Sequence, residues 1–189
     1  MKYICVFCGS SRGNRPIYQE NAKKMGQILV KRGFGLVYGG GNLGLMGIIA
    51  DTVLAAGGEV IGVIPEFLVS GEVAHSGLTK LHIVKSIHDR FAMMVELADA
   101  FVALPGGYGT FEEFCEVLTW AQLRLHQKPL ALLNVEGYYD PLLGLFDNAM
   151  NEGFLRPFYR SLVLEASDPE DLLDLLVNYH QILKRSCLV

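Results

Sequence analysis

The chain has 189 residues, of which 51% are hydrophobic and 19% are charged, and its formal net charge is −4. This composition excludes a disordered chain and suits one domain with a substantial core. Lys and Arg are scattered without a basic stripe, so we expect no nucleic-acid partner. The apolar stretch at the N-terminus is too short to be the hydrophobic core of a signal peptide, and no apolar run reaches the roughly 18 residues of a membrane span. We therefore expect a cytoplasmic protein with no membrane partner.

Short apolar strands alternate with helical segments along the chain. The predicted strands are Tyr3–Phe7, Gly35–Tyr38, Glu59–Ile64, Leu81–Val84, Ala100–Leu104, Leu130–Asn134 and Leu162–Leu164. The predicted helices are Pro16–Lys31, Met46–Ala56, Ile87–Ala98, Thr110–Leu125, Pro141–Glu152 and Pro169–Leu183. Such repeated strand–helix units predict an α/β fold: a Rossmann-like, doubly wound, mainly parallel sheet of seven strands flanked by helices. We expect residues 1–189 to form a single nucleotide-binding domain.

Three glycine-bearing loops follow predicted strands. They are Cys8–Ser11, Gly39–Gly47 and Leu104–Glu113. In an open parallel sheet, ligands bind beyond the carboxyl ends of the strands, which brings these loops to one edge. Any one of them could be only a tight turn, but three together favour an anionic ligand. The irregular segment Glu66–Lys80 is long enough to be functional as well.

The third loop combines two kinds of chemistry. A strand, a glycine turn and a helix in succession aim backbone N–H groups at an anion, usually a phosphate. We expect Glu112 and Glu113 in the first turn of the following helix, where carboxylates suit the dipole but would compete with a phosphate. Phosphate binding beside carboxylate chemistry is typical of a nucleotide-processing site.

Several alternative sites are disfavoured. The chain has neither G-x-G-x-x-G after its first strand, as NAD binding requires, nor the phosphate loop of an NTPase. Cys5 and Cys8 form a C-x-x-C, but they lie in a strand pattern where residues three apart point to opposite faces, so we interpret them as buried strand residues. The five histidines are dispersed, and we expect structural or solvent roles for His75 and His88. We expect no metal and no cofactor.

Pro105-Gly106-Gly107-x-Gly109-Thr110-x-x-Glu113 resembles the P-G-G-x-G-T-x-x-E motif of the Lonely Guy family, whose members release cytokinin bases from their riboside 5′-monophosphates. The resemblance includes the first two glycine loops, Glu72 with Ala74-His75, and Thr119–Leu123, and covers about residues 3 to 180. Many members are labelled lysine decarboxylases. No lysine of this chain lies in a loop suited to pyridoxal phosphate, which gives that label no support.

The resemblance implies roles for matching positions. Arg90 and Glu113 correspond to the catalytic pair. Arg90 alone would be equally consistent with a solvated charge, and Glu113 alone with a carboxylate that only complements the helix dipole. The implied substrate-binding residues are Glu72, Gly106, Gly107, Tyr108, Gly109, Thr110, Glu112, Gly40, Gly41, Ser10, Met94 and Thr119. Phe91 stands where the family usually has lysine, which should weaken phosphate or carboxylate contacts or alter base selectivity.

The expected activity is hydrolysis of the N-glycosidic bond of purine riboside 5′-monophosphates, with a small nucleotide as the only required partner and a homodimer as the assembly. The apolar stretch Phe91–Met94 and the helix through Trp120 offer an interface, although core packing explains the same residues. Two alternatives stay open. One is a nucleosidase for AMP or other purine monophosphates, and the other is a non-catalytic nucleotide-binding module on the same fold.

Overall fold

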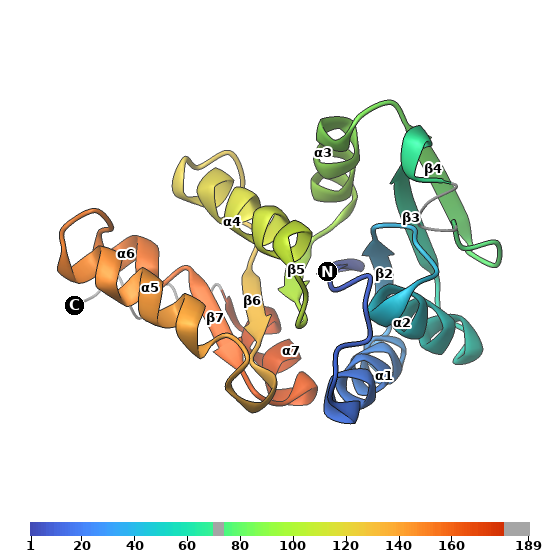
Figure 1. Ribbon diagram of the computed structural model, residues 1–189, viewed down its shortest axis with the longest axis horizontal. Coiled ribbons are helices and arrows are strands. Elements are labelled where there is room, and N and C mark those ends of the chain that lie inside the picture. The colour runs from blue at the N-terminus through green and yellow to red at the C-terminus, as the bar shows by residue number, and fades with distance from the viewer. Residues whose placement is uncertain (70–73, 180–189) are drawn as a thin grey trace.

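Seven parallel strands form one sheet in the order β4-β3-β2-β1-β5-β6-β7, as the computed structural model shows for residues 1–69 and 74–179 (Figure 1). The strands are β1 (Tyr3–Phe7), β2 (Gly35–Tyr38), β3 (Val60–Pro65), β4 (Lys80–Val84), β5 (Ala100–Ala103), β6 (Leu130–Leu133) and β7 (Val163–Ala166). The order reverses at β1, which pairs with both β2 and β5. This confirms the predicted doubly wound α/β class.

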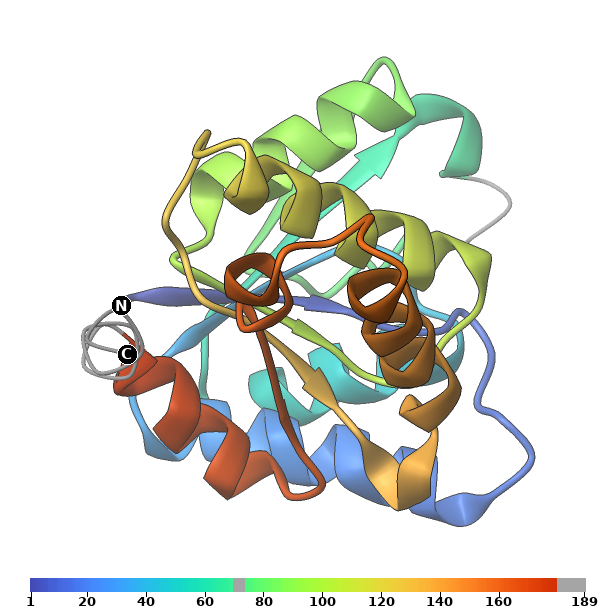
Figure 2. The same ribbon diagram turned by 90° about the vertical axis from the view of Figure 1, so that its left-hand side faces the viewer.

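Helices cover both faces of the sheet. They are α1 (Pro16–Lys31), α2 (Gly44–Ala55), α3 (Ile87–Leu97), α4 (Tyr108–Gln122), α5 (Asp140–Asn151), α6 (Pro157–Arg160) and α7 (Pro169–Val177), with short 3-10 turns η1 (Glu66–Leu68) and η2 (Val135–Gly137). Figure 2 shows α1, α2 and α7 on one side of the sheet and α3, α4 and α5 on the other. Among the described residues, no helix combines the length and apolar character that a membrane crossing requires.

The core is split in two by the sheet, because successive side chains of a strand point to opposite faces. Ile4, Val6 and Cys8 pack with α1, α2 and α7, whereas Cys5 and Phe7 pack with α3, α4 and α5. Burial on both faces explains why the strands are nearly continuous apolar runs. It also confirms that the two cysteines of the C-x-x-C are buried on opposite sides.

Most predicted elements are present within one or two residues, with four differences. Helix α4 covers Tyr108–Gln122 rather than Thr110–Leu125, because Gly107 takes the extended N-cap position and Leu123 already caps the helix at its other end. The four-residue α6 was not predicted, since so short a segment carries no periodicity. Ile87, expected to face the protein, has 48% of its surface exposed. The last helix ends at Val177, with Asn178 as its C-cap, short of the predicted end at Leu183, which lies outside the described residues.

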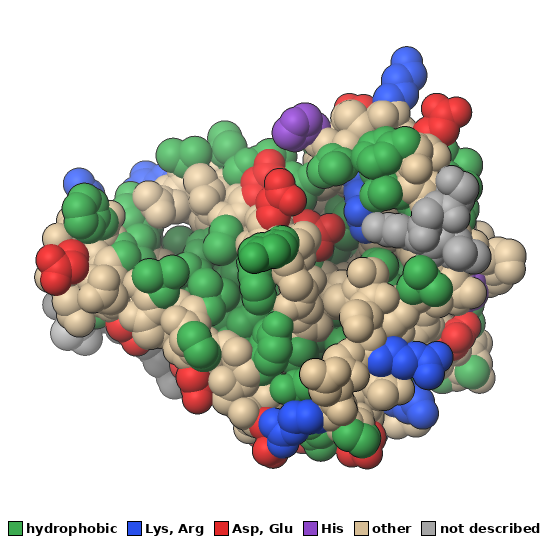
Figure 3. Space-filling view, in the orientation of Figure 1, with side chains coloured by type: hydrophobic (Ala, Val, Ile, Leu, Met, Phe, Trp, Pro, Cys, Tyr) green, Lys and Arg blue, Asp and Glu red, His purple; other side chains and the backbone are tan. Residues whose placement is uncertain are grey.

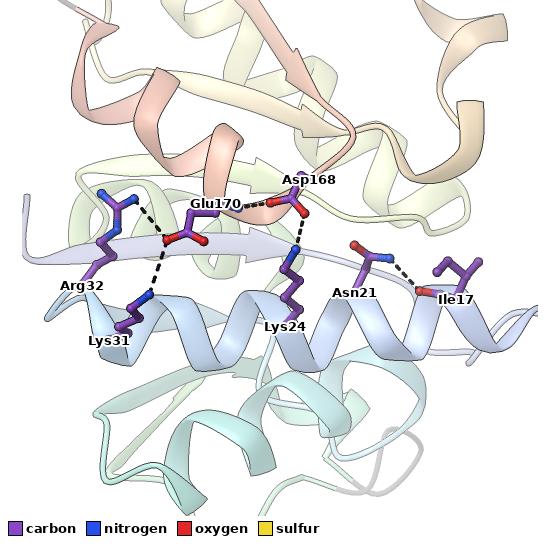
Figure 4. A network of polar contacts seen from close by, with 7 residues as sticks. All are labelled: Ile17, Asn21, Lys24, Lys31, Arg32, Asp168 and Glu170. Atoms are coloured by element: carbon purple, nitrogen blue, oxygen red, sulfur yellow. Dashed lines mark hydrogen bonds and ion pairs between the residues drawn. The ribbon is translucent and has the colours of Figure 1, made fainter.

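Ion pairs join the outer surfaces of α1 and α7 (Figure 4). Lys24 pairs with Asp168, the N-cap of α7, while Lys31 and Arg32 reach Glu170 at 3.5 and 3.8 Å. These side chains are largely exposed, so each pair contributes little free energy at physiological salt. The buried leucines of α7 supply most of its packing.

Candidate active site

The three glycine loops meet at the carboxyl edge of β1, β2 and β5, as predicted. The loop after β1 lies in the middle and bonds to both others through its backbone. The N–H of Gly9 donates to the carbonyl oxygen of Pro105 at 3.1 Å, and the N–H of Leu45 donates to the carbonyl oxygen of Gly9 at 2.9 Å. The loops therefore form one hydrogen-bonded frame.

The frame is packed so closely that glycine is required at two contacts. A Cβ on Gly44 would lie 2.2 Å from the carbonyl carbon of Ser10, and a Cβ on Gly106 would lie 2.1 Å from Oγ1 of Thr110. Neither contact leaves room for a methyl group. Gly44 also has a φ of +61°, a conformation that favours glycine.

A cavity of about 180 Å³ opens at this edge. Its lining residues are Val6, Phe7, Cys8, Gly9, Ser10, Gly39, Met46, Arg90, Gly107, Tyr108, Gly109, Thr110 and Glu113. Figure 3 shows acidic side chains gathered over α4 beside the hollow between α4 and the elements to its right. The sequence-predicted pair, Arg90 from α3 and Glu113 from α4, is thus brought to one cavity from the two halves of the sheet.

The amino end of α4 points its backbone at this cavity. Gly107 is the N-cap, and the first intrahelical bond in this turn runs from the N–H of Phe111 to the carbonyl oxygen of Gly107, at 3.1 Å. The N–H groups of Tyr108, Gly109 and Thr110 therefore have no acceptor within the helix. Three such donors at the positive end of a helix form a binding site for a phosphate.

The early start of α4 corrects the prediction for the two glutamates. Because the helix begins at Tyr108, Glu112 and Glu113 lie in its second turn and not in its first. Glu113 lines the cavity one turn beyond the N–H groups, so its carboxylate is separated from the anion-binding turn. A phosphate and this carboxylate can occupy the same cavity at different depths.

Arg90 is held by the second glycine loop. Its Nη2 donates to the carbonyl oxygen of Gly39 at 3.1 Å. A Cβ on Gly39 would lie 1.9 Å from this Nη2, so the guanidinium packs directly on the glycine backbone. The helix that carries Arg90 starts at a side-chain cap, since Oγ of Ser86 accepts the N–H of Asp89 at 3.0 Å.

Cys8 forms a neutral part of the cavity wall. Burial raises the pKa of its thiol far above the ordinary value, the negative charge of Glu113 raises it further, and Arg90 lowers it. A thiol that stays protonated contributes shape and a weak donor here, and not a nucleophile.

The other predicted substrate-binding residues divide into two groups. Ser10, Gly107, Tyr108, Gly109 and Thr110 line the cavity together with Arg90 and Glu113. Gly106 lines an adjoining cavity of about 290 Å³, whose wall also includes Tyr18 and Tyr138.

The second group lies away from the cavity wall. Gly40 and Gly41 are buried behind Gly39. Met94 is buried in the core because it lies on the inner face of α3, while Thr119 is exposed about three turns along α4. Glu112 is exposed, since it points about 100° away from Glu113 around the helix. Glu72 lies outside the described residues.

Phe91 does not line the cavity. Only 4% of its surface is exposed, and its ring packs edge-on against Trp120 with 5.1 Å between ring centroids. The phenylalanine that stands where the family usually has lysine therefore lies in the core between α3 and α4.

Gly39, in the loop expected beside the ligand, lines the cavity, and so do Cys8 and Met46, which were not singled out as ligand-binding residues. Each is the first residue after a strand or lies in the first turn of the helix that follows, and that position is the signal that could have found them.

Comparison with known proteins finds relatives over most of the chain. The family model described as "possible lysine decarboxylase" matches residues 46–176. A probable cytokinin riboside 5′-monophosphate phosphoribohydrolase of Oryza sativa subsp. japonica is 51% identical over 176 residues, which are 93% of this chain and 79% of the relative. A cytokinin riboside 5′-monophosphate phosphoribohydrolase of Arabidopsis thaliana is 49% identical over 178 residues, 94% of this chain and 82% of the relative.

Solved structures share the fold at lower identity. A molybdenum cofactor binding protein from Rippkaea orientalis superposes with a TM-score of 0.70 at 24% identity, over 94% of this chain and 96% of that chain. The molybdenum cofactor carrier protein of Chlamydomonas reinhardtii gives a TM-score of 0.64 at 19% identity, over 89% and 91% of the two chains. At such identities only the fold is shared. The sequence relatives, at about half identity over most of both chains, show that this chain belongs to the Lonely Guy family.

Proposed function

We propose that this chain hydrolyses the N-glycosidic bond of cytokinin riboside 5′-monophosphates, giving the free base and ribose 5-phosphate. One observation carries the proposal: Arg90 and Glu113 line the same small cavity as the unpaired N–H groups at the start of α4. A phosphate site next to a carboxylate and a guanidinium suits a phosphorylated sugar. The relatives with phosphoribohydrolase names support the same activity.

The 5′-phosphate would bind the N–H groups of Tyr108, Gly109 and Thr110 and the Thr110 hydroxyl. Thr110 is buried, with 3% of its surface exposed, and packs closely against Gly106, so its side chain has little freedom to move before the substrate arrives. Binding energy from the phosphate, which does not react, would hold the ribose in register for cleavage.

Glycosidic cleavage passes through an oxocarbenium-like sugar, which a nearby carboxylate stabilises. Glu113 would stabilise this charge and orient a water molecule. The water oxygen bonds to C1′ as the C1′–N bond breaks and its electron pair leaves with the purine. The water's proton passes to Glu113, the departing purine takes up a proton from solvent, and Glu113 returns its proton to solvent, so that the net change is the addition of one water. Arg90 would position the sugar hydroxyls or Glu113 and favour the ionised carboxylate by its charge.

The finer predictions belong to the same proposal. Ser10, Gly107 and Tyr108 would contact the substrate directly, and a homodimer in the cytoplasm stays our expectation. Of the stretch predicted as an interface, Phe91 and Met94 are buried within the chain. The exposed apolar side chains nearby are instead Ile87 on α3 and Leu123 at the end of α4, with 48% and 63% of their surfaces exposed.

The test is base release by the purified protein from N6-isopentenyladenosine 5′-monophosphate and from AMP, followed by chromatography. We expect Glu113→Gln to lower kcat by about 10²–10⁴-fold, the range for loss of an acid–base or charge-stabilising group. Glu96→Gln, which changes an exposed carboxylate on α3, is the matched control and should keep the wild-type rate.

Faster release from AMP than from the isopentenyl nucleotide would favour the general nucleosidase over the cytokinin enzyme. Binding of ribose 5-phosphate without release of base from either nucleotide would overturn the enzyme and leave the nucleotide-binding module.

A further inference from the structure

His75 is a buried histidine that the proposed chemistry does not use. Among the described residues, the buried polar side chains are Thr110, in the cavity, and His75, which has 7% of its surface exposed. His75 follows Ala74, which pairs with Gly41 in an isolated antiparallel bridge. It therefore lies against the far side of the glycine loop that holds Arg90.

Hydrogen bonds fix the imidazole in one tautomer. The N–H of Gly77 donates to Nδ1 at 3.1 Å, so Nδ1 carries no proton. The proton is on Nε2, which donates to Oδ1 of Asp51 on α2 at 2.9 Å. Both ring nitrogens are thus satisfied, and the ring is tied to α2 at one end and to its own loop at the other.

The backbone of His75 holds the glycine loop. Its N–H donates to the carbonyl oxygen of Gly40 at 3.0 Å, and the neighbouring carbonyl, that of Gly39, accepts Nη2 of Arg90 at 3.1 Å. On its remaining side the loop is closed by β3, since a Cβ on Gly62 would lie 2.9 Å from the Cα of Gly40. Movement of residue 75 would therefore move the carbonyl that holds Arg90.

We propose that His75, anchored by Asp51, is a positioning residue that sets the orientation of Arg90 through the carbonyls of Gly40 and Gly39. The inference rests on the proposed function, because it assigns to His75 an effect on the step that Arg90 assists. His75 itself touches no substrate.

The chain offers a matched control in His126. The N–H of Lys128 donates to its Nδ1 at 3.1 Å, as that of Gly77 does in His75, and its Nε2 lies 3.0 Å from the carbonyl oxygen of Val117. His126 lies between α4 and β6, where it packs against Phe101, and it lines neither of the two cavities at the candidate site. Both ring nitrogens of His126 are therefore hydrogen-bonded, as in His75, but His126 does not bond to the glycine loop that holds Arg90.

The experiment is a double-mutant cycle on kcat for base release. His75→Ala should lower kcat about tenfold with little change in KM, because a small displacement of a catalytic group is costly. In an Arg90→Ala background, His75→Ala should change kcat by less than about twofold, since two residues acting through one another are not additive. His75→Asn keeps an acceptor for the N–H of Gly77 and should restore part of the rate.

The controls separate positioning from folding. His126→Ala should lower the melting temperature but keep kcat. Asp51→Ala changes an exposed carboxylate and should fold normally. It should lower kcat by less than His75→Ala does, and this loss too should nearly disappear in the Arg90→Ala background. The proposal therefore stays testable if His75→Ala does not fold.

Equal losses from His75→Ala with and without Arg90, or a kcat for His75→Ala equal to that of His126→Ala, would overturn the positioning role while leaving the proposed function intact. A wild-type protein that releases no base would overturn both.

Discussion

At the scale of single residues, glycine is needed at the site for space and not only for backbone freedom. Gly44 and Gly57 both have positive φ, +61° and +79°. A Cβ on Gly57 would meet nothing within 4 Å, whereas a Cβ on Gly44 would strike the backbone of Ser10 at 2.2 Å. Substitutions at Gly57 and Gly44 therefore separate the free-energy cost of the left-handed backbone conformation from the cost of a steric collision.

We expect Gly57→Ala to lower the free energy of unfolding by about 1–2 kcal/mol, the cost of the left-handed conformation for alanine. Gly44→Ala should lose a further 1–3 kcal/mol or so, typical of overpacking, and should also lower kcat because the loop after β1 must move. Urea unfolding and base-release assays measure the two effects. Equal losses of stability with unchanged kcat would show that the loop contact at Ser10 can relax without consequence.

At the scale of elements, the start of β1 depends on a carboxylate from the other half of the chain. Oδ2 of Asp99, just before β5, accepts the N–H groups of Lys2 and Tyr3 at 2.6 and 3.0 Å. Burial raises the pKa of Asp99, but these two donors, together with the positive charges of the N-terminus and Lys128, lower it below its ordinary value. The carboxylate therefore stabilises the folded state in its ionised form.

Asp99→Ala should lower the free energy of unfolding at pH 7 by about 1–3 kcal/mol, because it leaves two N–H groups without their acceptor. Since the folded pKa is the lower one, the stabilisation is present above the unfolded pKa of about 3.9 and is lost as the pH falls through the folded pKa. The difference between wild type and variant should shrink below about pH 4. Asp99→Asn retains an oxygen acceptor and should lie between them. A difference that stays constant from pH 7 to pH 3 would exclude the ionised form as its source.

The elements themselves could be predicted because their patterns are strong. Pro16–Lys31 has a helical repeat ended by Gly33, and Tyr3–Phe7 is apolar on both faces, so both bounds match the structure. The start of α4 was missed by two residues, because Gly107-Tyr108-Gly109 has the composition of a turn, whereas in the structure Gly107 is the N-cap and Tyr108 and Gly109 are already helical.

The site could be predicted only in part, for a related reason. Motif and resemblance identified Arg90 and Glu113, which belong to separate helices that the fold brings together. They could not show that Met94 lies on the buried face of α3 and does not contact the ligand. Nor could they show that Cys8 and Met46 form part of the cavity wall. Those assignments depend on how α3 and α4 rotate against the sheet, which periodicity leaves undetermined.

At the scale of the whole molecule, the cavity lies where the strand order reverses. The helices that follow β1 and β5 lie on opposite faces of the sheet, so the loops above these strands diverge and leave space between them. Gly39 and Met46 come from the first half of the chain, and Gly107 and Glu113 from the second. A ligand in this cavity contacts both halves at once.

Such a ligand binds the folded chain and not the unfolded chain, because only the folded chain holds the N–H groups of α4 in place. Ribose 5-phosphate at 100 times its Kd should therefore raise the free energy of unfolding by about 2.7 kcal/mol. For a chain of this length that corresponds to a melting temperature about 5–11 °C higher.

Ribose without the phosphate should give a much smaller shift in melting temperature. Arg90→Ala should reduce the shift with ribose 5-phosphate, while Glu96→Gln should keep it. Differential scanning calorimetry makes the measurement. An equal shift from ribose and ribose 5-phosphate would mean that the start of α4 does not hold the phosphate, whereas loss of the shift in Arg90→Ala alone would tie sugar-phosphate binding to the junction of the two halves.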